Sequence, residues 1–456
     1  MIGACGTATI RLMSVPPSPG YLRRPYWHEA YSPTADAAPQ PLPERVDVCV
    51  IGAGYTGTIA ALALARVGAS VAVLDRHDPG WGASTRNGGI FHPGLNWGRG
   101  SLLKHHGRDL GEAVFRAGIQ AFFTAERFVT DNAFACDYRR SGFGVLAWSD
   151  QHLPGLRDEA EDYVDAGLTA RLVLGDELQE EVGTHYYPGA LIAEEAGMIH
   201  PAKYYGAVLE AARAAGAQVL GGTPVTAVER EGTDKVVVTD RGRVRAGAVL
   251  VASNGYTDGA VPWLQRRVLP IGSYIVATEP MSEELAHSIS PRGRTFFDSK
   301  NFLYYWHVNA ERRLVFGGRA SFAPTSVDKT AAILSRALKL VHPQAAGLKV
   351  DYAWGGNVGF TFDRLPHLGE HEGIHYALGY CGSGLALGTS FGLKIAEKIG
   401  KGADTAYEPS PFERIPFPGA PILPFVYRGR PWFLPFAGEW FRLADRWSRR
   451  GTRLPA

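Results

Sequence analysis

The clearest hydrophobic pattern in the chain begins at residue 46. Residues 46–51 are almost continuously apolar, which is typical of a strand buried on both faces of a parallel sheet. Glycines are concentrated between residues 52 and 57, residues 58–67 have the small apolar composition of a closely packed helix, and residues 70–75 form a second apolar run. The order strand, tight turn, helix, strand predicts a βαβ unit.

The rest of the chain alternates between helical and strand-like patterns. Helical composition predicts four further helices, over 101–132, 202–215, 328–341 and 385–399. Short apolar runs predict strands near 217–220, 225–229, 235–239 and 247–252. Residues 265–320 are β-rich, and residues 136–194 mix both types. The alternation predicts an α/β protein with a Rossmann-type domain.

Composition excludes several classes of protein. The chain is 45% hydrophobic and 20% charged, with a net charge of +2, so neither a disordered chain nor a nucleic-acid-binding protein is expected. The four cysteines are far apart and form no CxxC pair, which argues against a disulfide framework or a metal site and favours a reducing cytoplasm. No apolar run is long enough to span a membrane.

The first glycine-rich segment predicts a dinucleotide site. Gly52 permits a tight turn, Gly54 allows a pyrophosphate to approach the backbone, and Gly57 allows the helix to pack on the strand. The helix N-terminus then offers unpaired N–H groups to phosphate. Asp75 ends the second strand, where a carboxylate accepts hydrogen bonds from a ribose diol. Tyr55, Thr56 and Arg76 complete the residues assigned to this part of the site.

Two further glycine-rich segments lie downstream of the first. Residues 82–89 (GASTRNGG) follow the second strand, and residues 379–384 (GYCGSG) precede the last predicted helix, after the TFDRLPHLG run at 361–369. Together with the first segment they resemble, in order, the motifs of the D-amino-acid-oxidase-like (DAO) family of FAD-dependent oxidoreductases. The branch that contains gamma-glutamylputrescine oxidoreductase is the most similar. The resemblance covers residues 46–400.

The resemblance implies the remaining cofactor residues. In the second segment they are Gly82, Ala83, Ser84, Arg86, Asn87, Gly88 and Gly89. In the third segment they are Gly379, Gly382, Ser383, Gly384 and Leu385. Val225, Gly255 and Gly356 are assigned to the same site.

The resemblance also implies a division into domains. Residues 1–44 are rich in proline and are expected to form an extended N-terminal arm. The FAD-binding domain is discontinuous and takes in 45–100, 195–262 and 351–408. An interleaved α+β substrate domain on a mostly antiparallel sheet takes in 101–194 and 263–350. Residues 409–456 form a C-terminal tail.

Departures from the family motifs concern the flavin linkage and the substrate. Gly356 stands where sarcosine oxidases of the family have a flavin-linking cysteine, and Arg86 stands near the linking histidine of related dehydrogenases, so FAD is expected to be bound non-covalently. Ala386 replaces a carboxylate-binding lysine, and residues 356–359 replace an arginine-containing turn. A buried carboxylate without a cation is costly. The substrate is therefore expected to be an alkylamine, or an amine whose charged groups lie far from the reacting C–H, unless Arg86 or Arg319 supplies an alternative anchor for a carboxylate.

The candidate substrate pocket is the aromatic run at residues 304–307. Tyr304, Tyr305, Trp306 and His307 form a strand-like segment whose alternation directs two of the four to one face. We assign catalytic or substrate-binding roles to Tyr304, Trp306 and His307. The alternative is that this run belongs to the core of a β-sheet.

The tail combines tryptophans with arginines. Residues 438–449 place Trp440, Leu443 and Trp447 at helical spacing, which predicts either a helix at a membrane surface or a helix packed on the protein itself. The predicted activity is FAD-dependent oxidation of a small amine, with oxygen or a quinone as electron acceptor. Val315 falls near the oxygen-activating lysine of sarcosine oxidases, which puts oxygen in doubt. The rival predictions are a dehydrogenase that passes electrons to quinone or a carrier, and a flavin-binding subunit of a larger complex.

Overall fold

The computed structural model describes residues 20–34, 40–318, 325–401, 407–420 and 427–452. Its first sheet contains the predicted βαβ unit, in the strand order β10-β11-β12-β1-β2-β9, with β19 beside β12 and β18 beside β19. β1, β2, β9, β12 and β19 pair in parallel, whereas β10, β11 and β12 form an antiparallel meander. The bounds are β1 Arg45–Ile51, β2 Val71–Leu74, β9 Gln218–Leu220, β10 Val225–Glu231, β11 Asp234–Thr239, β12 Gly242–Val251, β18 His367–His371 and β19 Ile374–Leu378.

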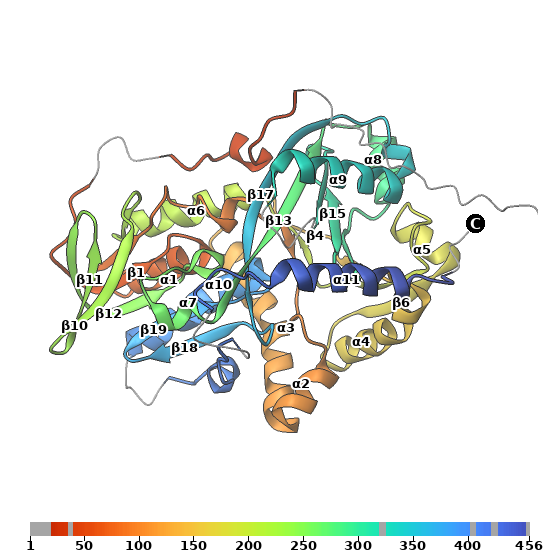
Figure 1. Ribbon diagram of the computed structural model, residues 1–456. Helices are drawn as coiled ribbons and strands as arrows, with labels where there is room; N and C mark the ends of the chain where they lie inside the picture. The colour runs from red at the N-terminus through yellow and green to blue at the C-terminus, as the bar shows by residue number, and fades with distance from the viewer. Residues whose placement is uncertain (1–19, 35–39, 319–324, 402–406, 421–426, 453–456) are drawn as a thin grey trace, which may run out of the picture.

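The second sheet is mostly antiparallel, as predicted, with β14–β5 as its parallel pair. It has the order β17-β13-β16-β15-β14-β5-β7-β6 and lies beside the first sheet (Figure 1). Its strands are β5 Phe143–Leu146, β6 Ala170–Leu174, β7 Gly189–Ala193, β13 Val268–Thr278, β14 Thr295–Asp298, β15 Tyr304–Val308, β16 Leu314–Gly318 and β17 Val350–Thr361. A small third sheet contains β3 Ile90–Phe91, β4 Arg139–Arg140 and β8 Gly197–Met198.

The helices cover both sheets. They are α1 Tyr55–Arg66, α2 Arg99–His106, α3 Arg108–Asp131, α4 Leu153–Asp165, α5 Gly175–Glu181, α6 Pro201–Ala214, α7 Pro262–Gln265, α8 Glu283–Ile289, α9 Val327–Val341, α10 Gly384–Lys401 and α11 Leu434–Ser448. The single helix predicted over 101–132 is wrong, because Gly107, at φ 77°, ends α2 and begins α3. A positive φ is readily available to glycine but interrupts an α-helix.

Small residues bring α1 and α10 into close contact. A Cβ atom at Gly392 would lie 2.8 Å from the carbonyl oxygen of Thr56, so this crossing requires glycine. Gly57 makes the corresponding close approach on the other side of α1, where its Cβ would lie 2.0 Å from the carbonyl oxygen of Gly52. The N-terminus of α1 is thereby fixed between the β1 turn and α10.

One expected domain boundary does not match the strand pairing that the structure shows. Residues 351–408 were expected in the FAD-binding domain, but β17 pairs with β13 of the second sheet from Val350 to Thr361. At its end β17 reaches the first sheet, where a Cβ at Gly255 would lie 2.9 Å from the Gly359 nitrogen. β17 therefore connects the two sheets, and its long arrow is visible in Figure 1.

The N-terminal arm packs on the body. Leu22 makes a β-bridge to Tyr352 of β17, and a short 3-10 helix, η1 (Tyr26–Glu29), follows. Trp27 is buried, and its indole N–H donates to the carbonyl of Asn87 at 2.8 Å. Residues 1–19 and 35–39 of the expected arm lie outside the described residues.

Candidate functional site

The first glycine-rich turn lies at the carboxyl end of β1. Gly52 has φ 108°, and its Cβ would lie 3.0 Å from the backbone of Ala252 at the end of β12. Gly54 caps α1 without a side-chain hydrogen bond, and the amide of Tyr55 donates to Ser84 Oγ at 2.9 Å. The positive end of the α1 dipole is therefore free of an anionic cap, as a phosphate site requires.

Asp75 lies beside this turn, just beyond β2. Its Oδ2 accepts from the amide of Ala53 at 2.7 Å, and its Oδ1 accepts from the amide of His77 at 2.9 Å. Burial raises the pKa of Asp75, and these two amides oppose the shift. A carboxylate has about four acceptor positions, so capacity remains for a diol. The next residue, Arg76, forms an ion pair with Asp258, and this pair fixes its side chain.

The second segment turns through η2 (Ala83–Thr85) and is tied internally by Asn87, whose side chain donates to the carbonyls of Ala83 and Ser84 at 3.1 and 3.0 Å. Arg86 donates to the carbonyl of Trp81 at 2.7 Å, and burial lowers its pKa. Within the described ranges no ion pair to a carboxylate forms at Arg86. A half-buried cation of this kind is suited to an anionic ligand group.

The third segment approaches the same space from α10. The amide of Gly379 donates to Asn254 Oδ1 at 2.9 Å, and Tyr380 and Thr56 share a hydroxyl hydrogen bond of 2.7 Å. Gly382 has φ 121°, and no atom lies within 4 Å of the place where its Cβ would be. The turn therefore leaves open space at the N-terminus of α10.

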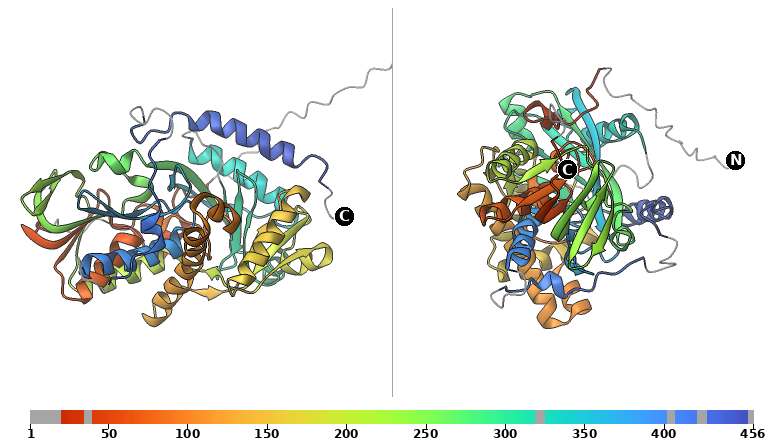
Figure 2. Two further views of the ribbon diagram at one scale, coloured as in Figure 1. Left: turned by 90° about the horizontal axis from the view of Figure 1, so that it is seen from below. Right: turned by 90° about the vertical axis from the view of Figure 1, so that its left-hand side faces the viewer.

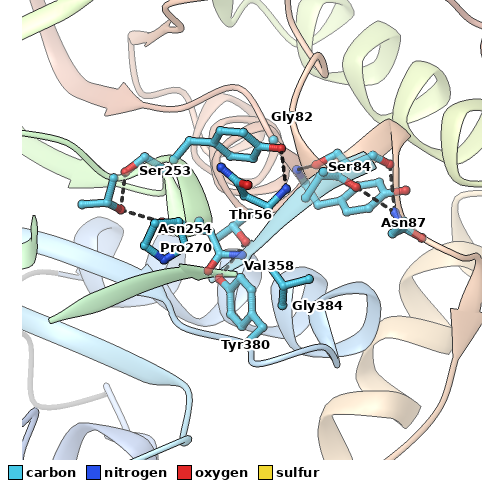
Figure 3. Close-up of a pocket in the computed structure, with 18 of the residues that line it drawn as sticks. Thr56, Gly82, Ser84, Asn87, Ser253, Asn254, Pro270, Val358, Tyr380 and Gly384 are labelled. Atoms are coloured by element: carbon cyan, nitrogen blue, oxygen red, sulfur yellow. Dashed lines mark hydrogen bonds between the residues drawn. The ribbon is translucent and has the colours of Figure 1, made fainter. Parts of the chain in front are cut away.

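These segments surround one cavity of about 670 Å³. This volume falls within the range of roughly 300–1,000 Å³ that small-molecule sites have. Figure 3 shows Thr56, Ser84, Asn87, Tyr380 and Gly384 around it, with Pro270 of β13 and Val358 of β17. The predicted cofactor residues that line it are Gly52, Gly54, Tyr55, Thr56, Asp75, Arg76, Gly82, Ala83, Ser84, Arg86, Asn87, Gly88, Val225, Gly255, Gly356, Gly382, Ser383, Gly384 and Leu385.

Three predicted cofactor residues are absent from the cavity wall: Gly57, Gly89 and Gly379. Each glycine instead allows a close approach within the protein. A Cβ at Gly89 would lie 2.6 Å from the carbonyl oxygen of Ile199, and one at Gly379 would lie 2.4 Å from Thr361 Cγ2. These residues shape the glycine-rich loops without lining the cavity.

The aromatic run at 304–307 contributes one residue to the cavity, Tyr305. Its ring lies between two glycines, since a Cβ at Gly88 or Gly317 would come within 2.7 or 2.2 Å of it. Its hydroxyl is 3.0 Å from Ser273 Oγ. The predicted alternation is correct, but packing on both faces of β15 leaves only Tyr305 at the cavity.

The expected pocket positions of Tyr304, Trp306 and His307 are therefore wrong. The Tyr304 ring contacts the ammonium of Lys300, 3.0 Å from the ring centroid, and Trp306 is fully buried against Phe296 and Phe316. His307 Nε2 donates to the carbonyl of Gly88 at 2.8 Å. Burial lowers the pKa of His307 to about 4, so its ring is neutral at pH 7. The ring holds the second glycine-rich segment in place without lining the cavity.

The cavity also contains residues that sequence reasoning did not assign to it. They come from four separate segments and include His92, Asn96, Glu159, Tyr163, Phe297, Leu303, Arg428 and Arg430. His92 follows the second glycine segment closely, and this proximity was a usable signal. The tail arginines were noticed in the sequence, but no local pattern indicates that the tail returns to the cavity.

The family model for FAD-dependent oxidoreductases (DAO) matches residues 47–398. This chain belongs to the DAO family. FAD is accordingly the cofactor of this DAO-family oxidoreductase, and the glycine cradles, the uncapped α1 N-terminus and Asp75 fit that group.

Curated relatives agree with this membership. The DAO-family chain is 33% identical to gamma-glutamylputrescine oxidoreductase from Escherichia coli (strain K12), over 85% of this chain and 92% of the relative. It is 25% identical to a glycine oxidase from Geobacillus kaustophilus (strain HTA426), over 81% and 96% of the two chains. The crystal structure of glycine oxidase from Geobacillus kaustophilus superposes with a TM-score of 0.68 and 22% identity, covering 83% of this chain and all of that one. The structural likeness shows a shared fold.

In the described part of the chain, no cluster of three or more histidine, cysteine, aspartate or glutamate side chains could hold a metal ion. None of the helices described combines the length and apolar character needed to cross a bilayer. Arg319, one of the two alternative carboxylate anchors, lies outside the described residues.

Proposed function

We propose that this protein oxidises the C–N bond of a small alkylamine whose charged group lies far from the reacting carbon. The cavity carries this proposal, because its wall includes both the glycine-rich segments and a set of aromatic and apolar side chains: Tyr163, Pro270, Phe297, Leu303 and Tyr305. Such walls favour an alkylamine by apolar contact and, when the amine is protonated, by attraction of the cation to the ring faces.

The positions of cations support the second part of the proposal. Gly356, Asn357 and Val358 line the cavity without a cationic side chain, and Ala386 is buried outside the cavity wall. A carboxylate next to the reacting carbon would lack its usual partner there. Arg428 and Arg430 line the cavity from the tail and suit an acid at the remote end of a longer substrate. An acylated diamine, the class in the name of the Escherichia coli relative, has this arrangement.

The chain's residues must bind and deprotonate the amine. When bound, FAD supplies the two-electron acceptor. His92 lines the cavity, and its Nδ1 lies 2.7 Å from the carbonyl oxygen of Pro93. A carbonyl can only accept, so Nδ1 carries the proton and Nε2 keeps a lone pair. Burial lowers the pKa of His92, which keeps the ring neutral at pH 7. We assign His92 as the acceptor of the ammonium proton and Tyr305 as the wall that orients the chain of the amine.

A series of diamines and N-alkylamines of increasing length tests the substrate class. Each additional buried methylene contributes about 0.8 kcal/mol, so kcat/KM should rise roughly fourfold per methylene until the cavity is filled. Glycine, sarcosine and D-alanine should be poor substrates. Efficient turnover of sarcosine or D-alanine would show that another cation, with Arg86 the first candidate, binds an α-carboxylate, and the alkylamine proposal would then be abandoned.

Neutral substitution of the tail arginines tests the remote anchor. Arg428→Gln/Arg430→Gln should raise KM for an amine with a distal acid at least tenfold, while KM for the corresponding simple diamine stays unchanged. The ratio of flavin to protein should also remain that of the wild type. Loss of FAD from the variant would instead assign these arginines to the cofactor.

The proposed electron acceptor is a quinone, with oxygen as the alternative. The family position that activates oxygen in sarcosine oxidases corresponds, loosely, to Val315, which is fully buried beside Trp27 and Tyr352. The side chain of valine carries no charge that could stabilise reduced oxygen. Substrate-dependent reduction of a short-chain ubiquinone analogue under nitrogen, at a rate well above oxygen uptake in air, is the expected result; the opposite ranking would identify an oxidase.

A further inference from the structure

Helix α11 packs on the protein through the side that carries Leu434, Gly438 and Asp445. Asp445 is buried, and its carboxylate accepts from the amide of Asn301 at 2.9 Å and from the amide of Phe302 at 3.1 Å. Four residues on, just beyond the end of the helix, the Arg449 guanidinium lies over the rings of Trp148 and Tyr186, at 3.9 and 4.1 Å from their centroids. Specific polar contacts therefore fix the rotation of α11 about its axis.

The opposite face of α11 is apolar and exposed. Phe436, Trp440, Leu443 and Trp447 recur at intervals of three or four residues, so they form one stripe. Their exposed fractions are 75%, 62%, 41% and 51%, and Trp432, just before the helix, is 60% exposed. Figure 2 shows α11 as the outermost element along one side of the molecule. Large aromatic side chains grouped in this way normally mark an interaction surface.

Charge around the stripe indicates the partner. Residues 427–452 carry six arginines against two acids, a net charge of +4, although the whole chain carries only +2. Arg428, Arg430, Arg446 and Arg450 are exposed. A second copy of the same positive surface would be repelled. Tryptophan is enriched at lipid–water interfaces, and arginine is attracted to anionic headgroups.

We propose that α11 docks the protein on an anionic membrane surface, with Phe436, Trp440, Leu443 and Trp447 in the headgroup region. The segment that leads into α11 contains Arg428 and Arg430, which line the catalytic cavity. Docking would therefore bring one wall of the cavity close to the lipid surface. The helix lies on the membrane and does not cross it, in agreement with the absence of a spanning helix from the described residues.

Vesicle flotation with the FAD-loaded, full-length protein tests the proposal. The protein should float with vesicles of phosphatidylcholine containing phosphatidylglycerol at roughly one lipid in three, and should bind pure phosphatidylcholine vesicles at least tenfold more weakly. High salt should release it, because attraction between exposed charges is screened. Replacing arginine by glutamine at 446 and 450 should weaken binding about fivefold per position.

Two double variants distinguish a specific effect of the stripe on vesicle binding from a general effect of exposed apolar side chains. Trp440→Gln/Trp447→Gln should lower vesicle binding at least tenfold while flavin content and turnover of a soluble amine are retained. The matched control is Val67→Gln/Val164→Gln, which removes two apolar side chains, 75% and 52% exposed, from the end of α1 and from α4 and should leave binding unchanged.

Three results would overturn the proposal. The first is equal flotation of the wild type and the tryptophan variant. The second is a wild-type dimer in sedimentation velocity that the tryptophan variant dissociates, which would make the stripe a self-association surface. The third is loss of flavin or of the folded state in the tryptophan variant, because this would mean that the stripe stabilises the fold.

Discussion

Replacement of Gly57 by alanine is disfavoured by the packing of the phosphate-loop region, although helix propensity favours alanine. Gly57 lies in the first turn of α1, and Gly→Ala inside a helix ordinarily stabilises by about 0.5–1 kcal/mol. Here the new Cβ would lie 2.0 Å from the carbonyl oxygen of Gly52 and 3.0 Å from Val50 Cγ1. The first contact is with backbone, so no side-chain rotation relieves it.

The clash decides whether Gly57→Ala lowers or raises the free energy of unfolding. Overpacking costs about 1–3 kcal/mol, occasionally more, and a contact with backbone belongs at the upper end of that range. After subtraction of the propensity gain we expect Gly57→Ala to lower the free energy of unfolding by about 2 kcal/mol, which changes the folding equilibrium roughly thirtyfold. Because α1 must move away from β1, the same change should weaken FAD binding.

Urea unfolding of apoprotein and holoprotein measures both effects, with bound flavin quantified by its absorbance. Gly100→Ala is the control: Gly100 is an exposed glycine of α2 with open space around its Cβ position, and this substitution should stabilise slightly. If Gly57→Ala keeps the wild-type urea midpoint and a full complement of FAD, the assignment of the tight β1–α1 contact is refuted.

Two further predictions concern the flavin linkage and pH. Acid precipitation should release all the flavin into the supernatant, because Gly356 and Arg86 provide no nucleophile for a covalent link; flavin fluorescence in the denatured protein band would contradict this. The free energy of unfolding should be lower at pH 5 than at pH 7.5. Burial lowers the pKa of His200, His307 and His342 to about 4, whereas in the unfolded chain they bind protons below about 6.5, so stability is fully present above pH 6.5 and declines toward pH 4. Urea midpoints that do not fall over this range would show that these rings are not buried as described.

Local signals predicted the βαβ unit that carries the first glycine-rich segment well. The apolar run at 46–51 and the glycines that follow constrain backbone conformation directly, and β1 and α1 form where the pattern indicated. The pairing of β17 was less accessible to prediction, since it depends on β13, which is about 80 residues away in the sequence.

The substrate part of the site depends on tertiary packing. Alternation along 304–307 gave the two faces of β15, but the sequence could not show which ring meets the cavity. That outcome depends on Gly88 and Gly317, which make room for Tyr305, and on Trp27 of the arm, whose ring stacks beside His307. Arg428 reaches the cavity because the tail folds back, with the hydroxyl of Tyr427 donating to the carbonyl of Val268 at 2.6 Å.

Anaerobic mixing of the purified, FAD-loaded protein with amines tests the central claim most directly, because it observes reduction of the protein's own flavin without any electron acceptor. An alkyl diamine or an acylated diamine should bleach the flavin absorbance completely within seconds, and glycine should not. Flavin that stays oxidised with every amine in the series, in protein that retains FAD, would contradict the account and favour a flavin-binding subunit without its own oxidation site.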